Sequence, residues 1–152
     1  MSLDDTDRRL LAYLQRHGQA TAQDLGQHLN LSASQAGRRR QRLEAAGVIT
    51  HYAARLDARR LGLGVQAFVQ VQLANHGAEA GRAVAELFRR RPEITSAWTM
   101  TGEADYLLRV WTEDLKALNT LLHEVLLVHP NIARIQSQIV MDQIKTDAPL
   151  PL

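Results

Sequence analysis

The chain has 152 residues, 45% of them hydrophobic, which is enough for one ordinary domain or two small ones with buried cores. It contains no cysteine, which excludes disulfides, thiolate metal ligands and cysteine nucleophiles. The net charge of +2 is unevenly divided, because residues 1–60 hold ten arginines and six acidic residues, whereas residues 61–152 hold eight basic and ten acidic residues. This asymmetry indicates that the first part contacts nucleic acid.

The amino terminus and the hydropathy predict a cytoplasmic protein. The first residues are acidic and then basic, without the apolar core of a secretory signal. No apolar run approaches the roughly 18–20 residues that span a membrane, so no membrane partner is expected.

Residues 1–50 predict three helices. The first begins at Asp4 and Asp7 and carries leucines on one face. The second begins at Thr21, with Asp24 three residues later, in the spacing of a capping box. Asn30-Leu31 then predicts a tight turn before the third helix.

The third helix begins at Ser32, and Gln35 completes a second capping-box spacing. Ala36 and Leu43 lie on its inner face, and Gly47 is suited to a left-handed cap at its end. Three helices with a tight turn between the second and third predict a helix-turn-helix.

This third helix carries the predicted DNA contacts. Guanidinium groups bind phosphates or the edges of guanines, and residues at the start of a recognition helix usually reach the bases. The alternative is that the arginine run is only a solvated surface. Its place on the third helix favours DNA contact. The predicted DNA-binding residues are Ser32, Ser34, Gln35, Arg38, Arg39 and Arg42.

Arg40 falls on the face that should point inward, four residues after Ala36 and three before Leu43. Its aliphatic stem is expected to cover the core while its head reaches solvent. No base contact is assigned to it.

The second half predicts a ferredoxin-like βαββαβ domain, so the fold class is α+β. Strands are expected at 65–73, 94–100, 106–111 and 135–141, and helices at 79–91 and 113–128. The strand at 106–111 is apolar on both faces, which predicts a partner chain and therefore a homodimer. The predicted segments are a DNA-binding domain at 1–50, a strand and linker at 51–64, this second domain at 65–145 and a tail at 146–152.

No pattern typical of an enzyme or a metal site is found. The six histidines have no ligand spacing, and there is neither a phosphate-binding glycine loop nor a nucleophile elbow. We therefore expect neither catalysis nor a bound metal. The two tryptophans are interpreted as core or interface residues.

Several short motifs, in this order and spacing, resemble the leucine-responsive regulatory protein/AsnC (Lrp/AsnC, or feast/famine) family from Leu3 to about Lys145. This resemblance implies a winged-helix-like reader of double-stranded DNA, a C-terminal sensor domain, dimers that often form octamers, and an amino acid or related metabolite as effector, with no other cofactor. The motifs are Leu3-Asp4-x-x-Asp7-Arg8, Leu31-Ser32-x-Ser34, Arg42-Leu43-Glu44-x-x-Gly47-Val48-Ile49, Thr101-Gly102-x-x-Asp105-Tyr106-Leu107-Leu108 and Ile139-Val140-Met141.

By position, the resemblance places effector contacts in the loop between the second and third strands and on the last strand. Gly102 would let backbone N–H groups approach a carboxylate, and Asp105 would accept from an α-ammonium group. The alternatives are a turn capped by Asp105 and, for Ser137, a hydroxyl bonded within the sheet. The implied effector-binding residues are Thr101, Gly102, Glu103, Ala104, Asp105 and Ser137.

Two positions depart from the family pattern. Position 40 is usually aliphatic and is Arg40 here, while position 104 is often aromatic and is Ala104 here, which predicts a smaller pocket wall.

Two other functions compete with regulation. A siroheme decarboxylase subunit resembles the same two domains, but it would carry a second strand rich in His, Tyr and Arg, where this chain reads ITSAWTMTG. An architectural DNA-binding protein would be indifferent to amino acids.

Overall fold

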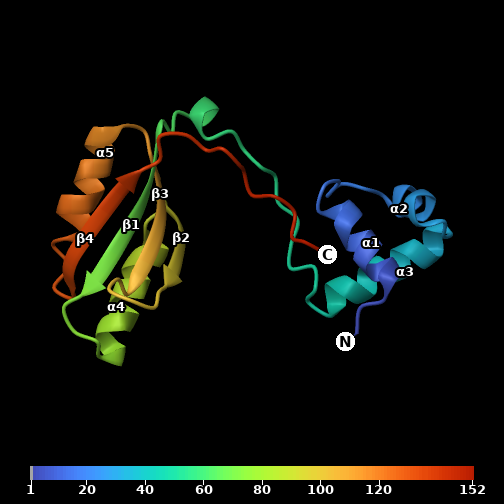
Figure 1. Cartoon of the computed structure of the whole chain (residues 1–152), viewed down its shortest axis with the longest axis horizontal. Coiled ribbons are helices and arrows are strands. Elements are labelled where there is room, and N and C mark those ends of the chain that lie inside the picture. Colours follow the sequence, from blue (N-terminus) through green and yellow to red (C-terminus); the bar gives the residue numbers. More distant parts are fainter. Residues whose placement is uncertain (1) are drawn as a thin grey trace. The chain divides into compact units, whose positions relative to one another are not determined.

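The computed structural model describes residues 2–152 and divides into two compact units (Figure 1). The helical unit comprises the chain up to Arg55 together with Ile144–Leu152, and the sheet unit comprises Leu56–Gln143. The chain therefore passes between the units twice. Within the described range, no helix has both the length and the apolar character needed to cross a bilayer.

The helical unit contains three helices, and each starts with a reciprocal capping box. In each box the N-cap side chain accepts a backbone N–H three residues later, and the residue there bonds back to the N-cap backbone. The predicted helix starts are thereby confirmed. The helices are α1 (Asp5–Leu14), α2 (Ala22–Leu29) and α3 (Ala33–Ala45).

Close packing at the α2–α3 turn explains a glycine inside α2. Asn30 ends α2 in the left-handed conformation, with φ of 57°. The chain then folds back over α2 so closely that a Cβ atom on Gly26 would lie 2.7 Å from the carbonyl oxygen of Leu31. The turn therefore requires glycine at this position. Leu10, Leu25 and Leu43, one from each helix, are fully buried beneath it.

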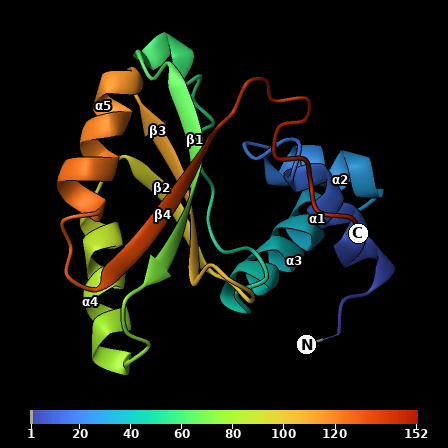
Figure 2. The same cartoon turned by 60° about the vertical axis from the view of Figure 1, so that its left-hand side comes forward.

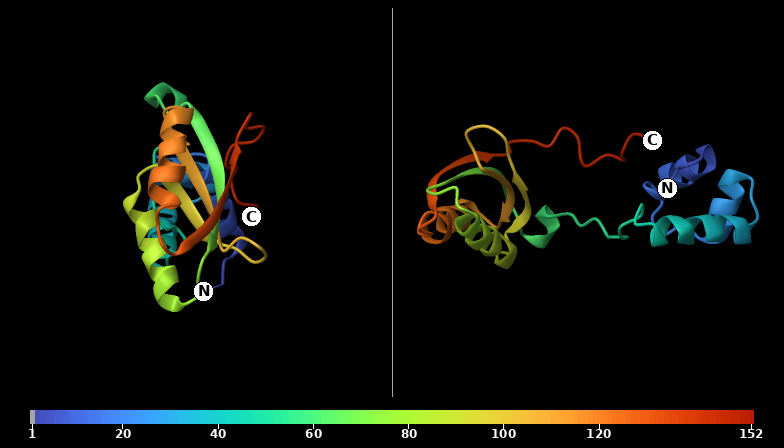
Figure 3. Two further views of the ribbon diagram at one scale, coloured as in Figure 1. Left: turned by 90° about the vertical axis from the view of Figure 1, so that its left-hand side faces the viewer. Right: turned by 90° about the horizontal axis from the view of Figure 1, so that it is seen from below.

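The sheet unit is a four-stranded antiparallel sheet in the order β2-β3-β1-β4, with α4 and α5 on one face (Figures 2 and 3). This confirms the predicted βαββαβ arrangement. The elements are β1 (Val65–Leu73), α4 (Ala78–Arg90), β2 (Ile94–Thr99), β3 (Tyr106–Thr112), α5 (Leu115–Thr120) and β4 (Ile132–Ile139).

The core of this unit lies between the sheet and its helices. Alternate residues of β1, from Ala67 to Leu73, are buried against this side. Tyr106 of β3 packs edge-on against Phe88 of α4, with ring centroids 5.3 Å apart. The other side of the sheet, called the open face below, carries Gln66, Phe68, Gln70, Gln72, Trp98, Leu107, Arg109, Trp111, Arg134, Gln136 and Gln138, as the strand register requires.

A β-bulge changes the predicted alternation of β2. Ile94 pairs with Val110 on the core side, but the register shifts before Ser96, so Trp98 pairs with Leu107 on the open face. A regular strand over the predicted range 94–100 would place Ile94 and Trp98 on the same face, and the structure does not have this arrangement. A bulge adds one residue, and one residue reverses the face of every side chain that follows it.

Other elements differ in length from the expectation. The last helix, expected over 113–128, starts after Asp114, whose side chain accepts the N–H of Ala117 at 2.7 Å. It continues beyond α5 as a π-helical segment over Leu121–Leu126. Within the described chain, the range 51–64, expected as a strand and linker, contains no strand.

Candidate functional site

The exposed face of α3 is the first candidate site. Ser34, Gln35 and Arg38 are exposed along its amino-terminal half. The Nη2 atom of Arg38 donates to the Oγ atom of Ser34 at 3.1 Å, one helical turn away. Because this contact involves one neutral acceptor at the surface, the guanidinium remains available to an anion.

Ser32 and Gln35 are both used in starting the helix. The Oε1 atom of Gln35 accepts from the backbone N–H of Ser32 at 3.0 Å, and the Gln35 N–H donates to the Ser32 hydroxyl at 3.2 Å. These contacts orient the first turn of α3. The two residues therefore hold the exposed face in place, whatever else they contact.

Arg39 and Arg42 bind the buried carboxylate of Asp7 in α1. Asp7 is fully buried, and its oxygens accept from Arg39 Nη1 at 2.8 Å and from Arg42 Nη2 at 2.6 Å. Arg39 also contacts Asp4 at 2.6 Å, and this hydrogen bond is the main reason why the pKa of Asp4 is lowered. Both arginines thus fix α3 against α1. Arg42 nevertheless keeps about half of its side chain exposed, 51% against 29% for Arg39.

Arg40 joins three segments of the helical unit. Its Nη1 atom donates to the carbonyl oxygen of Ala20 at 2.9 Å, and its Nε atom pairs with Glu44 at 2.9 Å. The guanidinium carbon lies 4.7 Å from the ring centroid of Tyr52, whose hydroxyl donates to Glu44 at 2.8 Å. This placement accounts for a residue to which the sequence assigns no base contact.

The same cluster shifts two titrating groups. The hydrogen bond from Arg40, and then that from Tyr52, lower the pKa of Glu44. Burial, followed by the hydrogen bond to Glu44, raises the pKa of Tyr52. Both shifts favour the charged carboxylate and the neutral phenol that this contact needs.

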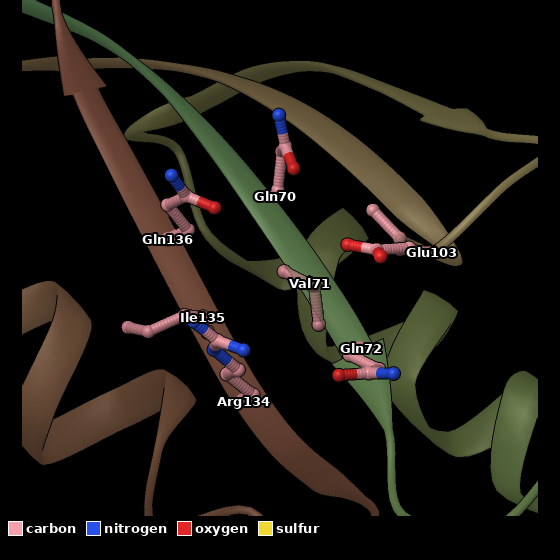
Figure 4. Close-up of a pocket in the computed structure, with 8 residues that line it drawn as sticks. Gln70, Val71, Gln72, Glu103, Arg134, Ile135 and Gln136 are labelled. Carbon is pink, nitrogen blue, oxygen red and sulfur yellow. The ribbon is translucent and has the colours of Figure 1, made fainter.

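The second candidate site is a small polar cavity of about 30 Å³ on the open face of the sheet (Figure 4). Gln70 pairs with Gln136, and Gln72 pairs with Arg134, across neighbouring strands β1 and β4. Val71 and Ile135 of the same strands also line it, and Glu103 and Ala104 complete the lining from the loop between β2 and β3. The cavity thus brings a cationic and an anionic side chain to one polar surface.

The loop residues divide between this cavity and the sheet. Gly102 has φ of +111°, a conformation that side-chain-bearing residues rarely adopt. Asp105 is engaged within the unit, because its Oδ2 atom accepts the backbone N–H of Leu73 at 2.7 Å and its Oδ1 atom lies 3.3 Å from His76 Nδ1. Thr101 is exposed beside them. The carboxylate of Asp105 therefore fixes the end of β1.

Ser137 lies apart from the cavity. It pairs with Val69 on the core side of the sheet, whereas its neighbour Gln136 is on the open face. The structure thus brings Glu103 and Ala104 to the cavity and leaves Ser137 on the opposite face. The polar residues of β1 and β4 in this lining were not among the predicted effector contacts, although their alternation with apolar residues in the sequence was a signal for them.

Metal-ligating side chains do not gather in the part of the chain that the structure describes. No group of three or more His, Asp or Glu residues there could hold an ion.

Two family models match the chain. The AsnC-type helix-turn-helix domain matches residues 3–44, and the Lrp/AsnC ligand-binding domain matches residues 66–150. The first match contains α1, α2 and all but the last residue of α3, and the second contains the sheet except for the first residue of β1.

Relatives match over nearly the whole chain. The DNA-binding transcriptional activator DecR of Escherichia coli is 33% identical over 99% of both chains. The Bkd operon transcriptional regulator of Pseudomonas aeruginosa is 34% identical over 99% of this chain and 98% of its own. A transcriptional regulator from Neisseria meningitidis, solved as a complex with L-Met, is 36% identical with a TM-score of 0.95, over 99% of this chain and 97% of its own.

Proposed function

Because the chain belongs to the Lrp/AsnC family of transcription regulators, with a helix-turn-helix and a ligand-binding domain, we propose that it reads specific DNA sequences under the control of an amino acid or related small metabolite. The observation that carries the proposal is the exposed Ser34–Arg38 face of a capped α3. In a dimer, two such helices would enter successive major grooves about one turn apart.

The proposed DNA contacts fall into two groups. Ser34, Gln35 and Arg38 lie where a recognition helix meets base edges, and Arg38 has the fork geometry that reads guanine. Ser32, Arg39 and Arg42 serve chiefly to position α3, and the exposed part of Arg42 is suited to a phosphate. The ion pairs with Asp7 support this division.

The proposed effector site is the cavity on the open face together with the loop Thr101–Asp105. Arg134 and Glu103, which both line the cavity, have the charges to bind the carboxylate and the ammonium group of an amino acid. The L-Met bound by the Neisseria relative supports this class of ligand. Ser137, on the other face, would contribute only at a contact between chains.

Assembly and location complete the proposal. The open face exposes Trp98 and other apolar groups, which supports a homodimer and, from the family, higher oligomers such as octamers. We propose that, as a regulator of chromosomal DNA, the protein acts in the cytoplasm. The relatives are named as regulators rather than enzymes, which ranks the decarboxylase alternative below regulation.

The DNA-binding proposal is tested by Arg38→Ala, with Arg82→Ala as the control. Both changes remove one exposed arginine, but Arg82 lies on α4 in the sheet unit. We expect Arg38→Ala to lower the affinity for DNA from upstream of the protein's own gene about tenfold. It should also reduce the slope of the logarithm of the binding constant against the logarithm of the salt concentration by about one. Arg82→Ala should change neither.

Titrations at two salt concentrations, with and without pooled amino acids, would measure these effects. Equal affinity for Arg38→Ala and the parent protein would refute the proposed surface. DNA binding that is unchanged by the added amino acids would instead favour the architectural alternative. Tetrapyrrole binding without DNA binding would favour the enzyme.

A further inference from the structure

A groove in the helical unit is lined in part by the end of the chain itself. The groove has a volume of about 280 Å³, and its lining includes Leu11 and Leu14 of α1 and Ile49 from the segment after α3. Leu150 and Leu152 complete this lining, although they lie about 100 residues further along the chain than Ile49. The terminus therefore lies along the apolar floor and forms one side of the groove, with Leu150 and Leu152 still half or more exposed.

The contact at Leu150 is made by its backbone, since the residue itself is 73% exposed. The side-chain amide of Gln15 makes two hydrogen bonds with the backbone of this one residue, since its Oε1 atom accepts the Leu150 N–H at 2.6 Å and its Nε2 atom donates to the Leu150 carbonyl at 3.2 Å. Leu150 stands between Pro149 and Pro151, which have no N–H. Gln15 therefore binds the one position in this tripeptide that offers both a donor and an acceptor.

A further hydrogen bond joins the two stretches of chain that enter the helical unit. The Nη1 atom of Arg55, where the first stretch leaves this unit, donates to the carbonyl oxygen of Asp147 at 2.6 Å. The two prolines also restrict the unbound terminus, which reduces the conformational entropy lost on docking.

From these contacts we propose that Ile144–Leu152 is a docking segment that binds the helical unit of its own chain in this groove. The helical unit is then attached to the sheet unit by two segments instead of one flexible linker. A second attachment restricts the orientations open to the unit, because docking becomes an intramolecular equilibrium at high effective concentration. This inference does not depend on DNA or effector binding.

Spin labelling tests the docking directly. Because the chain has no cysteine, Ala148→Cys offers a single site for a nitroxide, on an exposed residue between the two hydrogen-bonded positions. We expect a motionally restricted spectrum of intermediate mobility in the parent protein, because the label is exposed but its backbone is held on both sides. Gln15→Ala, or separately Leu150→Asp, should convert it to a fast-moving one, with a several-fold shorter correlation time. Gln19→Ala, which removes an exposed amide outside the groove, should leave it unchanged.

A fast-moving label in the parent protein would overturn the proposal, as would equal mobility in the parent and both groove variants. A mixing experiment then tests which chain provides the groove. Labelled protein carrying Gln15→Ala is mixed with an excess of unlabelled parent and allowed to exchange subunits. The label should stay mobile if docking is within one chain. Recovery of the motionally restricted spectrum would show that a second copy binds the terminus and would refute the intrachain form.

Discussion

The arginines of α3 differ in what their guanidinium groups contact. Arg39 and Arg42 pair with the buried Asp7, and Arg40 pairs with Glu44. Arg38 contacts only a serine hydroxyl on its own helix among the described residues. A run of like charges in the sequence thus contains arginines with structural contacts and one, Arg38, that we propose to contact DNA.

The structural role of Asp7 is testable with Asp7→Asn. The change leaves two guanidinium groups without their buried carboxylate, which should destabilise the helical unit by about 1–3 kcal/mol. The lower end of that range applies if solvent compensates the half-exposed Arg42. Thermal unfolding followed by circular dichroism measures the loss. Asp5→Asn, on an exposed residue of the same helix turn, is the control and should have little effect.

Glu44 predicts a pH dependence of stability. Its pKa lies below the usual 4.5 because Arg40 and Tyr52 donate to the charged carboxylate. A lowered pKa in the folded state contributes stability above pH 4.5, and this contribution is lost as the pH falls through the folded value. The difference in unfolding temperature between the parent and Glu44→Gln should therefore be largest near pH 6 and shrink towards pH 3. A constant difference would contradict the role of this charge.

At the scale of elements, the turn between α2 and α3 depends on one close approach. A Cβ atom at position 26 would lie 2.7 Å from a backbone oxygen, which cannot move without opening the turn. A Cβ atom on Gly37, in α3, would meet only the Cβ atom of Ala22 at an ordinary 3.6 Å. Gly26 is therefore the position at which to test the close approach, and Gly37 is its matched control in a helix.

We expect Gly26→Ala to destabilise the helical unit by about 1–3 kcal/mol through overpacking. Gly37→Ala should be neutral, or stabilise by up to about 1 kcal/mol, because alanine favours the helix. Chemical denaturation of both variants gives the two values. Similar values for the two variants would mean that the turn tolerates a side chain at Gly26.

The bulge in β2 decides which side of the sheet receives Trp98. An unbroken register would place it on the same side as Ile94, whereas the shift places it beside Leu107 on the open face. Trp111 of β3 lies on that face as well, opposite Gln66. Both tryptophans of the chain therefore lie on the open face, and their fluorescence depends on whether that face is covered.

At the scale of the whole molecule, this surface predicts self-association. Trp98→Lys places a charge on the open face and should shift the protein to smaller species in sedimentation velocity. Leu115→Lys, at an exposed leucine on α5, is the matched control and should leave the assembly unchanged. Dilution of the parent protein should also shift the tryptophan emission to longer wavelength. Identical sedimentation of the parent and Trp98→Lys would show that this face is not the interface.

Local signals in the sequence determined the helices, their caps and the order of the strands. Ser32 and Gln35 are three residues apart, so their capping box requires nothing outside one helical turn. The alternation from Ala67 to Leu73 likewise follows from the two-residue repeat of a strand with one buried face. Such features can be predicted from the sequence because the interacting groups are neighbours in the chain.

Only the tertiary structure decided how distant groups are paired. Asp7 and Arg42 are 35 residues apart, and Gln15 and Leu150 are 135 residues apart, so no local pattern relates them. The sheet register assigned Ser137 to one face and Gln136 to the other. The sequence by itself therefore determined the elements and the family, while packing determined which charges meet, because that depends on the distance between atoms in the folded chain rather than on their separation along it.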